Sequence, residues 1–319
     1  MPTAVVAIGG NSLIRAGEKG TIAEQLANVR RTCNALVGLL AQGYQLVITH
    51  GNGPQVGAAL LRSERAADEV YRQPLDVCVA TTQGEIGYLL QQALTDRLAH
   101  AGISRPVASV LTQVVVSADD PAMTHPTKPV GPFYSQRDAE ARRAQFGWAV
   151  VDDAGRGWRR VVPSPEPLQI VEESAIRTLV RAGALVIACG GGGIPVVRED
   201  GSYRGIDAVI DKDSASVLLA LSLEADLLVM STDVDRVYVN YRKPDQRALD
   251  RISAADLRRL YAEGHFPPGN MGPKIAAALK FVENGGERAL ITSYELLLDA
   301  MRGEAGTHIV GAGAVAEAR

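Results

Sequence analysis

The stretch AVVAIGGN at residues 4–11 decides the fold, because an apolar, β-branched run ends there directly in two glycines. A second stretch, QLVITHGNGP at residues 45–54, repeats the pattern. Continuous apolar runs of this kind are typical of buried parallel strands. Glycine has no Cβ, so an anion can approach the free backbone N–H groups at the carboxyl end of such a strand. The two stretches therefore predict two neighbouring anion-binding loops in one α/β sheet.

Predicted strands and helices alternate along most of the chain, which favours a mostly parallel sheet with helices packed against it. Further strands are expected at residues 107–116, 184–189, 226–231 and 288–292. Helices are expected at residues 22–40, 75–100, 169–182, 213–223 and 273–285. Turn residues predict hairpins around residues 199–202 and near Tyr238.

Residues 119–166 interrupt this alternation. Seven of the 16 prolines lie between Pro121 and Pro167, no long helical period is present, and only short strands are expected around residues 148–151 and 158–162. Long connections inside a compact domain are usually functional. We expect a small protruding subdomain here, and two lobes that meet at residues 210 and 211.

Composition excludes several classes of function. The 319 residues carry a net charge of −3 and 5% aromatic residues, which argues against nucleic-acid binding. No apolar run approaches the length of a membrane span, and no secretory signal pattern is present. Cys33, Cys78 and Cys189 show neither disulfide nor zinc spacing, so we expect buried thiols and a cytoplasmic protein. No cluster has metal-ligand spacing, so a metal is expected to arrive only with a nucleotide.

The common nucleotide signatures fit poorly. No GxxxxGK[ST] motif occurs, which excludes a P-loop. The spacing GxGxxxG, formed by Gly51, Gly53 and Gly57, is one residue longer than the dinucleotide fingerprint GxGxxG. The acidic residue that this fingerprint requires about 20 positions later is also missing. A nicotinamide-dependent enzyme is therefore not favoured.

Two lysines stand at predicted helix starts, where their charge opposes the helix dipole. Lys212 lies in IDKD at residues 210–213, and Lys274 follows GNMGP at residues 269–273. A bound anion would compensate for this placement, and either Asp211 or Asp213 could hold the Lys212 ammonium. A solvated helix cap is the alternative. The pair, each beside glycines, predicts a polyphosphate site.

Three other features have open readings. The run Gly190–Gly193 follows a buried strand, so a close backbone approach to a ligand or a neighbouring loop is favoured over a flexible linker. Lys128, in the expected subdomain, either reaches the acceptor or is an exposed loop lysine. His50 is interpreted as a packing residue rather than a catalytic base.

Seven motifs, in order, resemble those of the carbamate kinases of the amino-acid kinase superfamily. They are IGGN at 8–11, THGNGPQ at 49–55, QGEIGY at 83–88, PTKP at 126–129, GGGGIP at 190–195, IDKD at 210–213 and MGPK at 271–274. The resemblance implies a three-layer αβα sandwich and a homodimer. It also implies an N-terminal lobe (1–210) for the acceptor and for dimerisation, and a C-terminal lobe (211–319) for ATP or ADP. The implied reaction is ATP + carbamate ⇌ ADP + carbamoyl phosphate, with Mg²⁺ carried by the nucleotide.

The resemblance also implies roles for individual residues. Lys212 and Lys274 would neutralise charge on the transferred phosphoryl group, and Asp213 would orient both lysines. The binding residues implied are Gly9, Gly10 and Asn11 for phosphate, Gly51, Asn52, Gly53 and Lys128 for carbamate, and Asp233, Tyr238, Met271 and Gly272 for the nucleotide.

Two other functions compete with this one. The first is a kinase of the same superfamily with a different small acidic acceptor, and the second is a nucleotide-binding sensor without turnover. Met230, Ser231 and Asn270 depart from the family's usual residues on the nucleotide side. Arginine breakdown and purine or allantoin breakdown both stay open as sources of carbamoyl phosphate, and so does the physiological direction.

Overall fold

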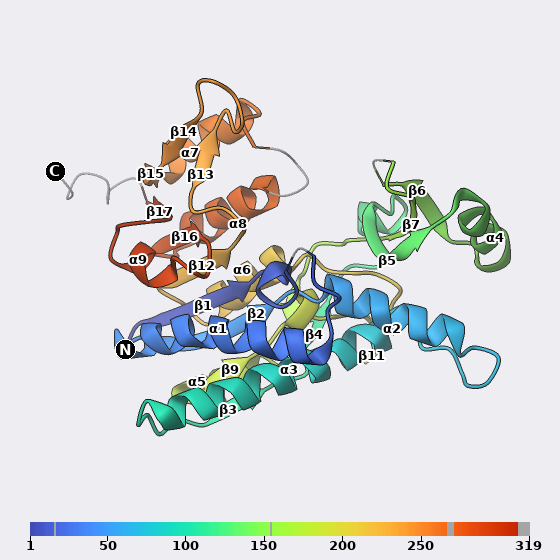
Figure 1. Ribbon diagram of the computed structural model, residues 1–319, viewed down its shortest axis with the longest axis horizontal. Helices are drawn as coiled ribbons and strands as arrows, with labels where there is room; N and C mark the ends of the chain where they lie inside the picture. The colour runs from blue at the N-terminus through green and yellow to red at the C-terminus, as the bar shows by residue number, and fades with distance from the viewer. Residues whose placement is uncertain (16, 154, 267–270, 312–319) are drawn as a thin grey trace.

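A sheet of eight strands forms the centre of the molecule (Figure 1). The computed structural model describes residues 1–15, 17–153, 155–266 and 271–311. The order across the sheet is β15 (Arg251–Ser253), β17 (Thr307–Val310), β16 (Arg288–Thr292), β12 (Leu227–Ser231), β1 (Thr3–Ile8), β2 (Gln45–His50), β9 (Leu185–Ile187) and β3 (Val107–Ser109). Within this described sheet, β16 and β17 are the one antiparallel pair. The prediction of a mostly parallel sheet is confirmed.

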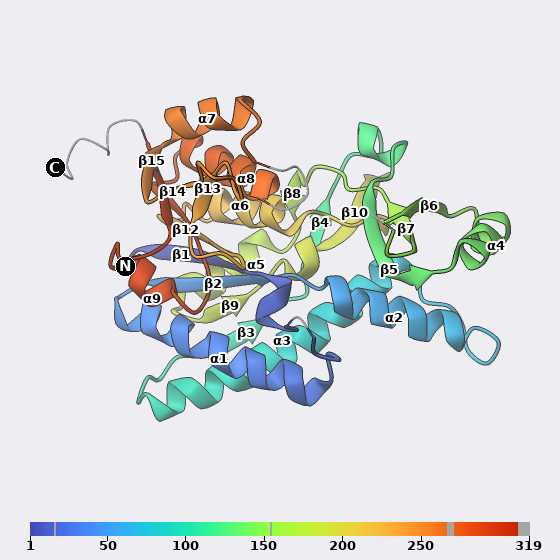
Figure 2. The ribbon, with the colours of Figure 1, turned by 45° about the horizontal axis from the view of Figure 1, so that its top comes forward.

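Helices cover both faces of this sheet, as the alternation of side chains along β1 requires. Val6 and Ile8 join one core with α1 (Ile22–Ala41), α3 (Leu75–His100) and α9 (Leu297–Met301). Val5 and Ala7 join the other core with α5 (Glu173–Arg181), α6 (Lys212–Ser222), α7 (Ala254–Ala262) and α8 (Met271–Glu283). Figure 2 shows α1 and α3 below the sheet and α6, α7 and α8 above it. The expected three-layer αβα sandwich is therefore confirmed.

The single strand expected at residues 107–116 is wrong, because the chain changes sheets within it. β3 belongs to the central sheet, whereas β4 (Gln113–Val115) belongs to a second sheet with β8 (Gln169–Ile170), β10 (Ile194–Glu199) and β11 (Ser202–Gly205). Between the two strands, Gln83 of α3 accepts from the Thr112 N–H at 2.8 Å and donates to the Thr112 carbonyl at 3.1 Å. This side chain replaces the lost ladder bonds, so the backbone can leave the sheet.

Smaller differences concern element bounds. The helix expected from residue 169 begins at Glu173, because Gln169 and Ile170 pair with β4 as β8. The hairpin expected around residues 199–202 is formed by β10 and β11. The hairpin expected near Tyr238 is formed by β13 (Val237–Val239) and β14 (Arg247–Leu249).

The chain leaves the sandwich in the region expected for a subdomain. There β5 (Lys128–Tyr134), β7 (Trp158–Val162) and β6 (Ala149–Asp152) form a three-stranded sheet with α4 (Gln136–Phe146), projecting beyond α2 (Gly53–Arg65) (Figure 1). Only short strands were expected in this region, and the structure adds the helix α4. α4 buries only Ala139 among its residues, so no apolar period marks it.

Arginine–aromatic stacking takes the place of a large aliphatic core in this subdomain. Arg142 lies over the Tyr134 ring with its guanidinium carbon 4.3 Å from the centroid, and Arg160 lies 4.7 Å from the Trp148 ring centroid. Such cation–π contacts stabilise sites that are too small to bury many apolar side chains. We call residues 128–162 the protruding subdomain from here on.

The central sheet contains strands from both sides of the boundary expected at residues 210 and 211, because β1 pairs with β12. The division into two functional lobes stays a proposal. Three short 3₁₀ turns, η1 (Gly10–Ser12), η2 (Pro121–Met123) and η3 (Gly190–Gly192), complete the described elements. Residues 312–319, where fraying was expected, lie outside the described residues. None of the described helices is long and apolar enough to cross a membrane.

Candidate active site

The two glycine loops predicted to bind anions are neighbours. β1 and β2 run in parallel with Ile8 opposite His50, so both loops leave the same edge of the sheet. A Cβ on Gly51 would lie 3.6 Å from the backbone nitrogen of Gly10, which shows how closely they approach. Gly9 and Gly10 open η1, whereas Asn52 and Gly53 open α2. The side chain of Asn11 lies outside the described part of the structure.

The third glycine run packs against the second loop. Gly191 has φ +67°, and a Cβ there would lie 2.3 Å from the side-chain nitrogen of Asn52. A Cβ on Gly192 would lie 2.3 Å from the Ile210 carbonyl oxygen. The buried Asn52 amide in turn donates to Thr82 Oγ1 of α3 at 2.8 Å. The run is therefore a site of close backbone approach rather than a linker.

The two predicted lysines meet on one carboxylate. Lys212 begins α6, and Lys274 lies in the first turn of α8. The Lys274 ammonium donates to Asp213 Oδ2 at 2.9 Å, and the Lys212 ammonium lies 3.0 Å from Asp213 Oδ1. A hydrogen bond of 2.6 Å between Thr49 and Ser216 fixes α6 against β2. Of the two candidates for holding Lys212, the structure therefore selects Asp213.

All three charged groups of this cluster are nearly buried, with side-chain exposures of 14% for Lys212, 10% for Lys274 and 8% for Asp213. Burial alone would raise the pKa of Asp213, but the two ammonium charges outweigh it and hold the pKa well below its usual range. Burial lowers the pKa of Lys212, and only part of that effect is offset by Asp213. The contact between Lys212 and Asp213 lacks hydrogen-bond geometry, so the Lys212 ammonium has no hydrogen-bond partner among the described residues.

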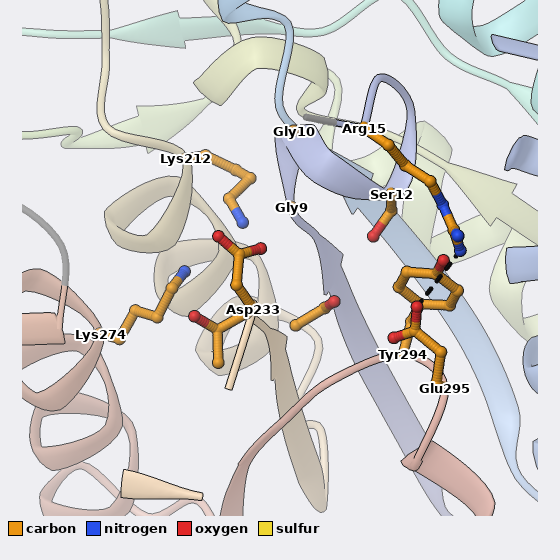
Figure 3. Close-up of a pocket in the computed structure, with 11 residues that line it drawn as sticks. Gly9, Gly10, Ser12, Arg15, Lys212, Asp233, Lys274, Tyr294 and Glu295 are labelled. Carbon is orange, nitrogen blue, oxygen red and sulfur yellow. Dashed lines mark hydrogen bonds and ion pairs between the residues drawn. The ribbon is translucent and has the colours of Figure 1, made fainter. Parts of the chain in front are cut away.

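A central cavity of about 590 Å³ is lined by the two lysines of this cluster. Figure 3 shows Lys212, Lys274 and Asp233 directed into the cavity, with Gly9 and Gly10 also on its wall. Lys212 forms an ion pair with Asp213, but its ammonium has no hydrogen-bond acceptor among the described residues, and an oxyanion in the cavity can supply one. The central cavity is therefore lined by two lysines and by the glycines of the first loop, and ammonium groups of this kind can bind an anion.

Two further cavities adjoin the central one. A cavity of about 510 Å³, which we call the tyrosine cavity, shares Thr232 and Asp233 with it and is also lined by Tyr238, Tyr241 and Met271. Gly272 is buried beside Met271 at the start of α8. The structure thus brings together the predicted nucleotide residues Asp233, Tyr238 and Met271.

The second neighbour, of about 200 Å³, is the small cavity. Gly51, Asn52, Gly53 and Lys128 all line it, as predicted for one binding site, and Lys212 lines both it and the central cavity. A group at Lys212 therefore has access to both cavities.

Sequence reasoning missed one wall of the central cavity. Arg15 forms an ion pair with Glu295 at 3.2 Å and lies 5.5 Å from the centroid of the Tyr294 ring. All three residues line the cavity (Figure 3). Arg15 and Glu295 are 280 positions apart in the sequence, and no local motif marks either of them.

His50 behaves as the packing residue that was expected. It is 1% exposed, and its Nδ1 contacts the Gly51 carbonyl at 3.0 Å. Burial, together with the nearby Lys212 charge, lowers the pKa of His50 to about 4. The imidazole is therefore neutral at physiological pH and is walled off from solvent.

Comparisons with known proteins identify the family of this chain. A family model described as the amino acid kinase family matches residues 2–293. The chain belongs to this family. Among the relatives of this amino acid kinase, carbamate kinase from Thermococcus kodakarensis is 49% identical, over 97% of this chain and 99% of that protein. A carbamate kinase-like protein from Escherichia coli K12 is 52% identical, over 96% and 98%.

A solved structure shows the same relation for this amino acid kinase. Carbamate kinase from Giardia lamblia bound to AMP-PNP superimposes with a TM-score of 0.92 at 43% identity, covering 97% of this chain and 98% of that one. Identity this high over nearly the whole length places the chain in the carbamate kinase branch of the family.

Proposed function

We propose that this protein is a carbamate kinase, which transfers a phosphoryl group reversibly between ATP and carbamate. The observation that carries the proposal is the position of Lys212 on the wall shared by the central and small cavities. A phosphoryl group held there lies between a donor on one side and an acceptor on the other. The high identity to carbamate kinases supports the same assignment.

Charge neutralisation and alignment are the tasks of the protein in this reaction. Carbamate is already an anion, so its oxygen needs no catalytic base before it attacks phosphorus. The reaction therefore needs no base from His50, which is buried and neutral. Lys212 and Lys274 stabilise the negative charge on the phosphoryl oxygens in the transition state, and Asp213 fixes where both ammonium groups lie.

The two substrates occupy opposite sides of this lysine pair. The nucleoside takes the tyrosine cavity, where Asp233, Tyr238 and Met271 converge, and its phosphates extend to the amides of Gly9 and Gly10. Carbamate takes the small cavity, whose volume of about 200 Å³ suits an acceptor of few atoms. Larger acceptors such as acetylglutamate or a nucleoside monophosphate fit this volume less well.

Magnesium is expected to enter with the nucleotide. Among the described residues no group of three or more His, Cys, Asp or Glu side chains is arranged to hold a metal ion. Asp233 is an exposed carboxylate on the wall of both the central and tyrosine cavities, which fits an ion held mainly by phosphates and water. When bound, Mg²⁺ supplies additional positive charge to the phosphate oxygens.

The decisive experiment is ATP formation from ADP and carbamoyl phosphate by the purified protein, with Mg²⁺ present. Parallel assays of ADP release with carbamate, acetylglutamate, glutamate and UMP test the rival acceptors. Turnover only with carbamate supports the proposal. ATP binding without any phosphoryl transfer would instead support the sensor.

We also propose a cytoplasmic homodimer. The three cysteines are free and buried, which is typical of proteins in reducing compartments. Tyr88 and Leu111 are 62% and 55% exposed beside a hollow of about 460 Å³ along α3. An exposed apolar face of this kind, in the lobe expected to dimerise, is a suitable contact for a second copy of the chain.

A further inference from the structure

Asp211 uses its two carboxylate oxygens for two different parts of the molecule. Oδ1 caps α6 by accepting from the backbone N–H groups of Asp213 at 2.9 Å and Ser214 at 3.2 Å. Oδ2 accepts a hydrogen bond of 2.9 Å from the ammonium of Lys128, at the start of the protruding subdomain. The side chain of Asp211 thus contacts both α6, which carries Lys212, and the protruding subdomain, which carries Lys128.

The geometry around Lys128 leaves it able to bind a second anion. Lys128 and Asp211 both line the small cavity, together with Lys212. An ammonium has three donors, and the bond to Asp211 uses one of them. The side chains of Lys128 and Asp211 are 40% and 27% exposed, so solvent weakens their ion pair. The pair therefore positions the ammonium and leaves it able to bind another anion.

Both carboxylate oxygens of Asp211, which lines the small cavity, already have hydrogen-bond partners. One oxygen faces the amino end of α6 and the other faces Lys128, so neither is left to repel an incoming anion. If Lys128 were absent, Oδ2 would become an unpaired negative charge on the cavity wall. The effect of Asp211 on anion binding therefore depends on whether Lys128 is present.

The surrounding segment supports this arrangement. Asp207 forms an ion pair with Arg160 of β7, and the Val209 N–H donates to the Pro163 carbonyl at 3.0 Å. Residues 207–211 are thus attached at three points to the protruding subdomain and to the chain that leaves it, and the next residue begins α6.

We propose that Asp211 is a positioning residue that couples the protruding subdomain to the lysine pair. It holds the Lys128 ammonium at the small cavity, where two of its donors have no partner among the described residues, while it caps the helix that carries Lys212 and Asp213. The inference rests on the proposed carbamate kinase function, because the anion in the small cavity is the acceptor of that reaction.

A double-mutant cycle tests the coupling, with ATP formation from ADP and carbamoyl phosphate as the assay. Asp211→Asn retains an oxygen that caps α6 but loses the ion pair with Lys128. We expect a roughly fivefold rise in KM for carbamoyl phosphate, with kcat, KM for ADP and thermal stability close to wild type. Lys128→Met should raise the same KM further, because it leaves Asp211 unpaired.

The double variant decides between coupling and independent effects. Adding Asp211→Asn to Lys128→Met removes the unpaired charge, so part of the lost affinity for carbamoyl phosphate should return. Losses that simply add in the double variant would overturn the inference. So would a fall in thermal stability with unchanged KM in Asp211→Asn, because Asp211 would then be only a helix cap.

A second readout is independent of activity. Both tryptophans of the chain, Trp148 and Trp158, lie in the protruding subdomain, and Arg160 links Trp148 to Asp207. Asp211→Asn and Lys128→Met should therefore shift the tryptophan emission in the same way, and unchanged emission in both would contradict the coupling. If wild type makes no ATP, the proposed function fails, whereas the emission still tests the contact.

Discussion

Asp213 carries one negative charge between two buried ammonium groups, so the cluster it forms with Lys212 and Lys274 retains one net positive charge. A buried surplus charge is unfavourable unless a ligand balances it. The site therefore accepts some instability in the empty state, and the binding of an anion relieves it. This is the electrostatic reason why the same three residues serve phosphate binding and catalysis.

Removing either ammonium should abolish most of the turnover. Lys212→Ala and Lys274→Ala are each expected to lower kcat for ATP formation by roughly a thousandfold, because each removes a charge aimed at the transferred group. The fold, checked by circular dichroism, should persist. Lys280→Ala, on the exposed face of α8, is the matched control and should retain wild-type kcat. Near-normal turnover in either site variant contradicts the mechanism.

His50 makes stability depend on pH. Its pKa is about 4 in the folded protein, whereas an exposed imidazole titrates at about 6.5. Between these values the unfolded chain binds a proton that the folded protein excludes. The free energy of unfolding should therefore fall as pH drops from about 6.5 to about 4, by up to about 3 kcal/mol from this group.

Urea unfolding at a series of pH values measures this effect. His50→Gln removes the titrating ring and keeps a donor for the Gly51 carbonyl, so the curve should become flatter in this interval. His125→Gln, on an exposed loop, is the matched control. The interpretation is wrong if the wild type and His50→Gln lose the same stability.

Sequence reasoning identified the site residues that a short motif of neighbouring positions marks. Gly51 follows a strand and Lys212 starts a helix, and both facts are visible within ten positions. The bond between Lys128 and Asp211 spans 83 positions, and the ion pair of Arg15 with Glu295 spans 280. Such contacts depend on how distant elements pack, so composition and spacing carry no sign of them.

Among the elements, η3 shows how backbone shape governs the small cavity. Gly191→Ala places a methyl group 2.3 Å from the Asn52 amide, in addition to the cost of φ +67°. We expect a loss of stability of about 2–4 kcal/mol and a higher KM for carbamoyl phosphate, because Asn52 must move.

Gly201→Ala is the matched control for this change. Gly201 has φ +81° in the β10–β11 turn, but a Cβ there meets no atom of the described residues within 4 Å. Gly201→Ala should lower the free energy of unfolding by only about 1–2 kcal/mol, the cost of a positive φ in alanine, and should leave KM unchanged. Equal effects of the two substitutions on melting temperature and KM would show that the contact with Asn52 is unimportant.

The elements that sequence reasoning missed share a physical cause. α4 buries one residue and is held by arginine–aromatic contacts, so a search for apolar periodicity finds nothing. The break between β3 and β4 depends on a polar contact with Gln83 of the preceding helix α3, 29 positions from Thr112. Apolar patterns predict elements that pack against a core, and these two features do not rely on such packing.

For the whole molecule, the proposed dimer has a direct test. Tyr88→Glu places a charge on the exposed apolar face of α3, and we expect it to convert a dimeric wild type to a monomer in sedimentation velocity. Tyr261→Glu, a tyrosine that is 40% exposed on α7, is the matched control and should remain dimeric. A monomeric wild type, or a Tyr88→Glu variant that stays dimeric, contradicts the proposal.

The central sheet sets which motions are available during turnover. β1, from the first half of the chain, is hydrogen-bonded to β12 from the second half. The two halves therefore contribute strands to one continuous sheet. A hinge between donor and acceptor sides would have to break that ladder. Opening and closing motions are therefore expected in parts of the molecule outside the central sheet. The backbone amide hydrogens between β1 and β12 should exchange with solvent only when the whole protein unfolds.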